Sequence, residues 1–217
     1  MSYITTTHLL DLLKEHTIVV NNPFWVRNYP EKLLVLNFPD LIPPTMVARN
    51  LEMFKVFREK HGDTIIKPLY GNGGAGIFKI QKDDPNLSSL IELFESTSGE
   101  PIIMQKYVPE VKSGDKRVIL VNGDPIGAIN RVPQAGEVRS NMHVGGKAEK
   151  IGLTDRDFEI CNKIGVLMKE KGQVLVGLDI IGDFLTEINL TSPTGIQELE
   201  RFNKLNVAEK IWEVLEK

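Results

Sequence analysis

Three side chains near the C-terminal end of the sequence offer oxygen ligands for a metal ion. Asp179, Glu187 and Asn189 lie within the segment GLDIIGDFLTEIN at 177–189. Carboxylate and amide oxygens suit Mg²⁺, whereas zinc prefers histidine and cysteine. Glu187 and Asn189 are two residues apart, so they share one face of a strand. The pattern indicates an oxygen-ligand metal site on a β-hairpin, and a solvated sheet face is the alternative.

The length of the turn decides whether Asp179 joins this face. A three-residue turn places Asp179 opposite Glu187, so that two carboxylates point at one spot and require a cation or a proton between them. A two-residue turn instead pairs Asp179 with Thr186 and directs Glu187 to the other face. The sequence leaves both registers open.

A glycine-rich turn within IIKPLYGNGGAGIFKI at 65–80 could bind phosphate. Its glycines allow positive φ and let successive backbone N–H groups face one anion; they are Gly71, Gly73, Gly74 and Gly76. Lys67, just before the turn, would neutralise phosphate charge. A dinucleotide fingerprint requires a helix after the glycines, but 77–81 alternates like a strand. We therefore expect a strand–flap–strand unit over nucleotide phosphates, with a plain flexible turn as the alternative.

The segment from 112 to 150 is basic, with seven Lys or Arg against four Asp or Glu. Arg131 and Arg139 belong to it, and arginine binds carboxylate or phosphate in a bidentate manner. Beside a nucleotide site they suit an anionic substrate or an acyl phosphate. A solvated charged loop is the alternative, and the absence of interleaved aromatic residues argues against nucleic acid.

Composition excludes several classes of protein. The chain has 217 residues, a net charge of −3 and one cysteine. This near-neutral balance argues against a nucleic-acid or membrane-surface binder, and one cysteine excludes an internal disulfide or a multi-cysteine zinc site. We find neither a signal-peptide pattern nor a long apolar run, so we expect a cytoplasmic protein that does not insert into membranes.

Helices and strands mix without strict βαβ alternation, which favours an α+β fold with largely antiparallel sheets. We expect strands at 17–20, 45–48, 64–67, 76–80, 101–105, 117–121, 125–131, 174–181 and 184–190. We expect helices at 3–16, 30–38, 50–60 and 85–95, a helix beginning at Thr154, and two helices at the end of the chain. The polar segment 132–150 is predicted to be an ordered loop.

Three runs of the sequence closely resemble the ATP-binding part of bacterial glutathione synthetases, a family of ATP-grasp ligases. They are the segments 65–80, 105–146 and 176–196. The resemblance implies the ATP-grasp fold, in which two α+β subdomains hold ATP between them. It divides the chain into the end of an N-terminal α/β domain with a linker helix (1–40), a lid subdomain with the flap (41–105) and a C-terminal subdomain with the metal and substrate site (106–217).

The resemblance also implies an activity. The family uses ATP and Mg²⁺, with Mn²⁺ as a substitute, to join γ-glutamylcysteine to glycine through an acyl phosphate. Its members carry an N-terminal domain, most of which this chain lacks, so a nucleotide-binding fragment without ligase activity is one alternative. A ligase for another acid and amine is the second. The partners are thus small molecules, and a homo-oligomer is compatible with the family.

Matched position by position, the resemblance implies roles for individual residues. Those expected to bind the nucleotide are Lys32, Lys67, the flap glycines 71–76, Gln105, Lys106, Tyr107, Val108 and Asp115. Those expected to stabilise the transferred phosphate are Arg117, Arg131, Arg139 and Asn141. Mg²⁺ is assigned to Asp179, Glu187 and Asn189. The substrate side is assigned to Arg131, Arg139, Gly145, Gly146, Ser192, Thr194 and Gly195.

Overall fold

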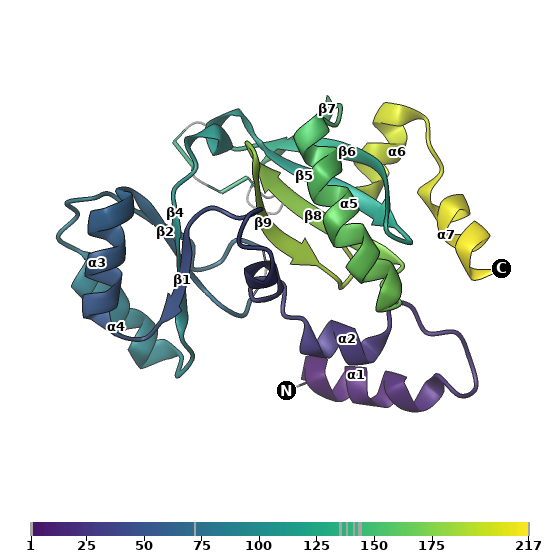
Figure 1. The fold of residues 1–217 in the computed structure, drawn as a ribbon, viewed down its shortest axis with the longest axis horizontal. Coiled ribbons are helices and arrows are strands. Elements are labelled where there is room, and N and C mark those ends of the chain that lie inside the picture. The colour runs from purple at the N-terminus through teal and green to yellow at the C-terminus, as the bar shows by residue number, and fades with distance from the viewer. Residues whose placement is uncertain are drawn as a thin grey trace.

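The computed structural model describes residues 2–71, 73–134, 136–137, 139–140, 142 and 145–216. Two lobes, each built on an antiparallel sheet, lie side by side, with the smaller one at the left of Figure 1. The chain passes from the smaller to the larger lobe just after residue 106. The expected α+β fold with antiparallel sheets is therefore confirmed.

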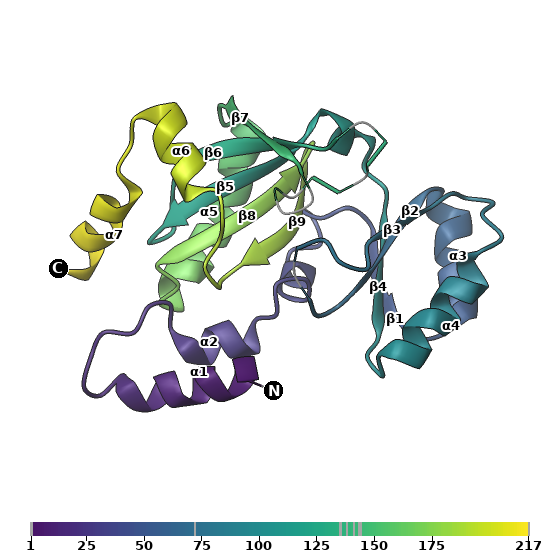
Figure 2. The same cartoon turned by 180° about the vertical axis from the view of Figure 1, so that it is seen from behind.

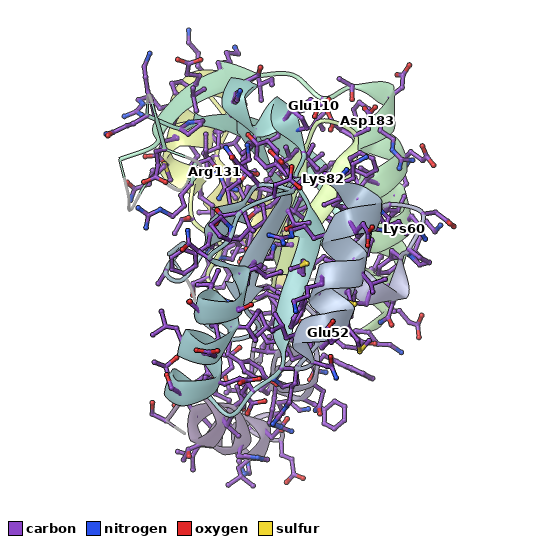
Figure 3. All side chains as sticks on the ribbon, turned by 90° about the vertical axis from the view of Figure 1, so that its left-hand side faces the viewer. Glu52, Lys60, Lys82, Glu110, Arg131 and Asp183 are labelled. Carbon is purple, nitrogen blue, oxygen red and sulfur yellow. The ribbon has the colours of Figure 1, made fainter. Side chains whose placement is uncertain are left out.

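The smaller lobe is a four-stranded sheet covered on one face by two helices. Its strands run in the order β1 (Thr45–Ala48), β4 (Ile102–Lys106), β2 (Thr64–Pro68) and β3 (Phe78–Ile80). The covering helices are α3 (Leu51–His61) and α4 (Leu87–Thr97), which face the viewer in Figure 3, where Glu52 and Lys60 mark α3. Phe54 and Ile91 pack from these helices onto Ile66 and Met104 of the sheet. This burial fixes the sheet that carries Lys67.

The larger lobe is a five-stranded sheet between helical layers. Its strands run in the order β7 (Lys147–Ile151), β6 (Asp124–Val132), β5 (Asp115–Val121), β8 (Leu175–Ile181) and β9 (Phe184–Asn189). One face carries α5 (Asp155–Glu170), and Figure 2 shows α6 (Ile196–Asn203) and α7 (Val207–Leu215) on the other side. Along β5, Val118 and Leu120 belong to the core beneath α5, whereas Ile119 and Val121 belong to the core beneath α6 and α7. The period-2 apolar pattern thus fixes both faces of the sheet.

Short elements link and flank the lobes. They are α1 (Ser2–Leu13), α2 (Pro23–Asn28) and the 3₁₀ turns η1 (Leu34–Asn37) and η2 (Pro109–Ser113). Figure 1 shows α1 and α2 beside the larger lobe, below its sheet. No helix in the described part of the chain is long and apolar enough to cross a membrane.

Three local predictions were wrong. The expected strand at 17–20 is irregular, because no strand pairs with it; instead the Asn21 side chain donates hydrogen bonds to the carbonyls of Leu175 and Leu190. The expected helix at 30–38 is a turn followed by η1. The end of the expected loop 132–150 forms β7, which pairs with β6 from Val132↔Lys147 onward. Whether 17–20 and the end of 132–150 form strands depends on pairing with distant strands, which a local pattern does not record.

Candidate active site

The hairpin of β8 and β9 brings two carboxylates onto one face by a route that neither expected register described. The turn has two residues, since Ile181 pairs with Phe184, yet Asp179 pairs with Glu187. A β-bulge next to Asp179 absorbs the extra residue, Thr186, whose hydroxyl donates to the Asp179 carbonyl at 3.1 Å. A bulge shifts the register by one residue and so returns Glu187 to the face of Asp179.

A cleft between the two sheets collects residues from both lobes. The smaller lobe contributes Ile65, Lys67, Ile77 and Gln105, and the larger lobe contributes Asp115, Arg139, Ser140, Asp179, Ile181, Thr186 and Glu187. Lys32 and the connection Lys106, Tyr107, Val108 and Val111 complete the lining. Apolar walls with a few charged groups at one end are typical of a site for a small polar ligand with an apolar part.

Two lysines lie at the charged end of the cleft. The Lys32 ammonium donates to the Gly71 carbonyl at 2.9 Å and pairs with Glu187 at 3.1 Å. The Lys67 ammonium lies 3.5 Å from the side-chain oxygen of Gln105. Burial lowers the pKa of Lys67 below its ordinary value, although the Glu187 carboxylate opposes the shift. An anion bound here would restore the favoured charged form of Lys67.

The glycine-rich turn has the backbone that the sequence predicts. Gly71, Gly73, Gly74 and Gly76 all have positive φ, at 116°, 67°, 79° and 71°. Side chains other than glycine adopt such conformations at a cost, so these positions explain the composition of the turn. The Gly71 carbonyl, held by Lys32, attaches one end of the turn to the cleft.

The connection between the lobes presents backbone groups to the cleft. The Lys106 N–H donates to Pro44 at 2.9 Å and the Tyr107 N–H donates to Asp63 at 2.9 Å, so both are engaged within the smaller lobe. The Val108 N–H donates to no atom in the described parts of the chain. A planar ligand between Ile65 and Val108 would find one free donor at this edge.

Arg117 and Arg131 are buried behind the cleft rather than lining it. Arg117 binds both carboxylate oxygens of Asp179, at 2.5 and 3.0 Å. Arg131 donates to Asp115 at 2.6 Å and contacts Asp179 at 3.0 Å. Burial opposes ionisation of Asp179, but the two arginines overcome it and hold its pKa below the ordinary value. Both guanidinium groups are thus committed to carboxylates in this arrangement.

Asp115 has an unused acceptor at the edge of the cleft. Its Oδ2 atom accepts from Arg131 and from the Ser140 hydroxyl, whereas its buried Oδ1 atom has no partner in the described structure. Burial raises the pKa of Asp115, and the nearby Asp179 adds to the shift. An unpaired buried oxygen is costly, so a ligand that donates a hydrogen bond fits this position.

Two of the three expected metal ligands line the cleft, and Asn189 is not among its lining residues. Asp179 and Glu187 both line the cleft, and the Asn189 amide donates to the Gly177 carbonyl at 3.3 Å, which orients its side chain. Within the described ranges no cluster of three or more His, Cys, Asp or Glu is placed to hold a metal, so a cation here would need ligands besides Asp179 and Glu187. The two carboxylates lie side by side, but Arg117 and Arg131 neutralise Asp179 and Lys32 neutralises Glu187, so a cation would compete with these partners.

The remaining predicted substrate residues lie on two loops. Arg139 lines the cleft and pairs with Glu137 at 2.7 Å. The Gly145 carbonyl accepts from Gln134 at 3.1 Å, beside the half-buried Gly146. Asn141 lies outside the described residues. The other loop contains Ser192, whose φ is 43°. Its Thr194 carbonyl accepts a hydrogen bond from Arg117 at 3.3 Å. Gly195 packs closely on the sheet, because a Cβ there would lie 2.7 Å from Ile129. The structure brings Arg139 into the cleft, and Arg117 joins the Thr194 carbonyl to Asp179, which lines the cleft.

Sequence reasoning missed the apolar lining residues Ile65, Ile77, Val111 and Ile181 and three polar residues at or near the cleft. Ser140 and Thr186 act through hydrogen bonds to Asp115 and Asp179, and a single hydroxyl gives no pattern in a sequence. Glu31 precedes Lys32, and burial together with the charge of Glu187 raises its pKa to about 7. Only its adjacency to Lys32 could have drawn attention to it.

Comparison with known proteins agrees with this geometry. The family model described as prokaryotic glutathione synthetase, ATP-grasp domain, matches residues 31–204. Glutathione synthetase of Brucella melitensis biotype 1 is 54% identical over 216 residues, which cover 100% of this chain and 69% of that protein. Glutathione synthetase of Agrobacterium fabrum is 52% identical over 217 residues, which cover 100% of this chain and 68% of that protein.

Solved structures share the fold at low sequence identity. D-cycloserine synthetase DcsG has a TM-score of 0.72 with 17% identity, covering 97% of this chain and 78% of that chain. The ATP-grasp ligase PsnB, in complex with a phosphomimetic variant of its minimal precursor, Mg and ADP, has a TM-score of 0.67 with 20% identity, covering 95% of this chain and 64% of that chain. These likenesses confirm the ATP-grasp fold.

Proposed function

The chain belongs to the prokaryotic glutathione synthetase family of ATP-dependent ligases, and we propose that its cleft binds ATP with Mg²⁺ to join γ-glutamylcysteine and glycine. Ligases with this fold bind ATP as a reactant and a divalent metal ion as a cofactor. One observation supports the specific site most strongly: Asp179 and Glu187 share a face beside Lys32 and Lys67. In such a cluster the two carboxylates can bind a metal ion, and the two ammonium groups can bind the phosphates that the metal ion contacts.

The nucleotide fits along the cleft with its phosphates at the charged end. The adenine would lie at the connection between the lobes, where the free Val108 N–H donates to a ring nitrogen. The phosphates would lie under the glycine-rich flap, next to Lys32 and Lys67. The unpaired Asp115 oxygen would accept a hydrogen bond from the ligand.

The proposed metal site consists of Asp179, Glu187 and Asn189. When bound there, Mg²⁺ would neutralise phosphate charge and align the terminal phosphate for transfer. Glu187 would then exchange its pairing with Lys32 for the metal, which releases the lysine toward the phosphates. The structure fits Mn²⁺ equally, because both ions accept oxygen ligands.

The chemistry needs no side-chain nucleophile. A carboxylate oxygen of γ-glutamylcysteine attacks the terminal phosphorus of ATP, the bond from that phosphorus to ADP breaks, and an acyl phosphate forms. The glycine amine then attacks the acyl carbon, inorganic phosphate leaves, and the amine loses one proton. Arg139 is the cleft-lining arginine that would stabilise charge on the transferred phosphate. Arg117 and Arg131 would act behind the cleft by holding Asp179.

The test is ADP release from Mg-ATP by the 217-residue chain, with γ-glutamylcysteine and glycine omitted in turn. Release that requires both substrates, with glutathione as product, supports the proposal. ATP binding without release would favour the nucleotide-binding alternative. Release with a different acid or amine, but not with this pair, would keep the ligase class and change the substrates. We also propose that the protein acts in the cytoplasm, where ATP and small metabolites are available.

A further inference from the structure

The loop between β6 and β7 carries Arg139 to the cleft, and several of its described contacts stay within the loop. Gln134 donates to the Gly145 carbonyl at 3.1 Å, which joins the two ends of the loop. Arg139 pairs with Glu137 at 2.7 Å, two residues away. Such contacts shape a loop but do not attach it to the sheet beneath.

Two residues of the loop make that attachment: Met142 packs against the apolar cluster that contains Ile119 and Ile129, and Ser140 makes the polar contact. Its hydroxyl donates to the Asp115 Oδ2 atom at 2.8 Å, and its residue is only 5% exposed although it lies in a loop. Asp115 is the first residue of β5, so the contact joins the loop to the centre of the five-stranded sheet.

The contact continues toward the proposed metal site. The same Asp115 oxygen accepts from Arg131 at 2.6 Å, and Arg131 reaches Asp179 at 3.0 Å. A continuous chain of buried polar contacts therefore runs from Ser140 through Asp115 and Arg131 to Asp179. Hydrogen bonds to a charged acceptor in such surroundings are stronger than neutral ones.

We propose that Ser140 is a positioning residue that docks the 133–146 loop on Asp115 and so holds Arg139 at the cleft. Ser140 touches no reacting atom in this scheme; it acts through Arg139. The kinetic consequence rests on the proposed function of the cleft, whereas the docking itself does not. The neighbouring residue, Arg139, would contact the phosphorylated dipeptide.

Trypsin cleavage after Arg139 reports loop docking without any substrate. Cleavage of a folded protein tracks the population of the locally opened state when opening is fast. Loss of a hydrogen bond to a charged acceptor shifts such an equilibrium about tenfold. We therefore expect Ser140→Ala to release the fragments 1–139 and 140–217 about tenfold faster than the wild-type chain. Peptides of 133–146 with Ser or Ala at 140 correct for the intrinsic preference of the protease.

Three further variants sharpen the comparison. Ser140→Thr keeps the hydroxyl and should restore the wild-type cleavage rate. Ser140→Cys keeps the size but donates only weakly, so it should behave like Ser140→Ala and serves if that variant does not fold. Ser89→Ala removes an exposed hydroxyl on α4 and is the matched control.

The kinetic measurement separates positioning from general damage. We expect Ser140→Ala to raise the KM for γ-glutamylcysteine about tenfold while the KM for ATP stays unchanged, since Lys32 and Lys67 do not depend on the loop. Wild-type cleavage rates in both Ser140→Ala and Ser140→Cys would overturn the docking. Faster cleavage with an unchanged dipeptide KM would overturn the role in positioning Arg139. If the wild-type chain makes no glutathione, the proposed function fails and cleavage alone still decides the docking.

Discussion

Lys32 and Glu187 form an ion pair at 3.1 Å, and the same ammonium holds the Gly71 carbonyl at 2.9 Å. A residue far from the hairpin in sequence thus joins the flap to a predicted metal ligand. Both side chains are largely buried, which limits screening by solvent. A cation that binds Glu187 must compete with Lys32, so metal binding and flap attachment are coupled through one contact.

We expect Glu187→Gln to reduce the dependence of ATP binding on Mg²⁺. The amide keeps the shape of the carboxylate but removes the charge that attracts the metal, and loss of one such group weakens a metal site about tenfold or more. Calorimetric titration of ATP with and without Mg²⁺ measures the effect. Glu52→Gln on the exposed face of α3 (Figure 3) is the control and should retain the wild-type ratio of affinities. An unchanged ratio in Glu187→Gln would remove it from the metal site.

Asp179→Asn should lower stability as well as metal binding. Asp179 lies between Arg117 and Arg131, each less than a tenth exposed, so its neutralisation leaves two buried charges poorly compensated. Breaking a buried pair from one side costs about 3–5 kcal/mol. Urea unfolding measures this loss, and Asp124→Asn at the exposed first residue of β6 is the control. A variant as stable as the wild type would show that the arginines do not depend on Asp179.

The sequence predicts most local elements but not the contacts that join them. The glycines of the flap and the strands of the hairpin are visible in residue type and alternation. The bulge at Thr186 is not, because a register shift depends on the partner strand. Likewise the arginine-rich pattern predicts anion binding, yet the structure pairs Arg117 with a carboxylate of the same chain. Pairing of opposite charges across strands is a tertiary effect that no local pattern records.

ATP affinity should fall as the pH rises into the alkaline range, through Lys67. Burial lowers its pKa in the free protein, so Lys67 loses its proton at a lower pH than an exposed lysine does. Phosphate binds the protonated form, and affinity is therefore full below this pKa and is lost above it. Titrations of ATP between pH 7 and 10 should show the decline in the wild type. Lys67→Met should bind ATP at least about tenfold more weakly, and with little dependence on pH. A parallel decline in the variant would assign the titration to another group.

Gly76→Ala tests whether the backbone of the flap limits phosphate binding. Gly76 has a φ of 71°, and a Cβ there would lie 3.2 Å from Pro68. Left-handed conformation costs a residue other than glycine about 1–2 kcal/mol, and the contact with Pro68 adds to this. Because the strain lies in the flap rather than in either core, we expect weaker ATP binding with little change in the unfolding transition. Gly99→Ala is the control, since a Cβ there meets nothing within 4 Å and no positive φ is required. If Gly76→Ala binds ATP as tightly as Gly99→Ala, the flap does not use this conformation to hold the phosphates.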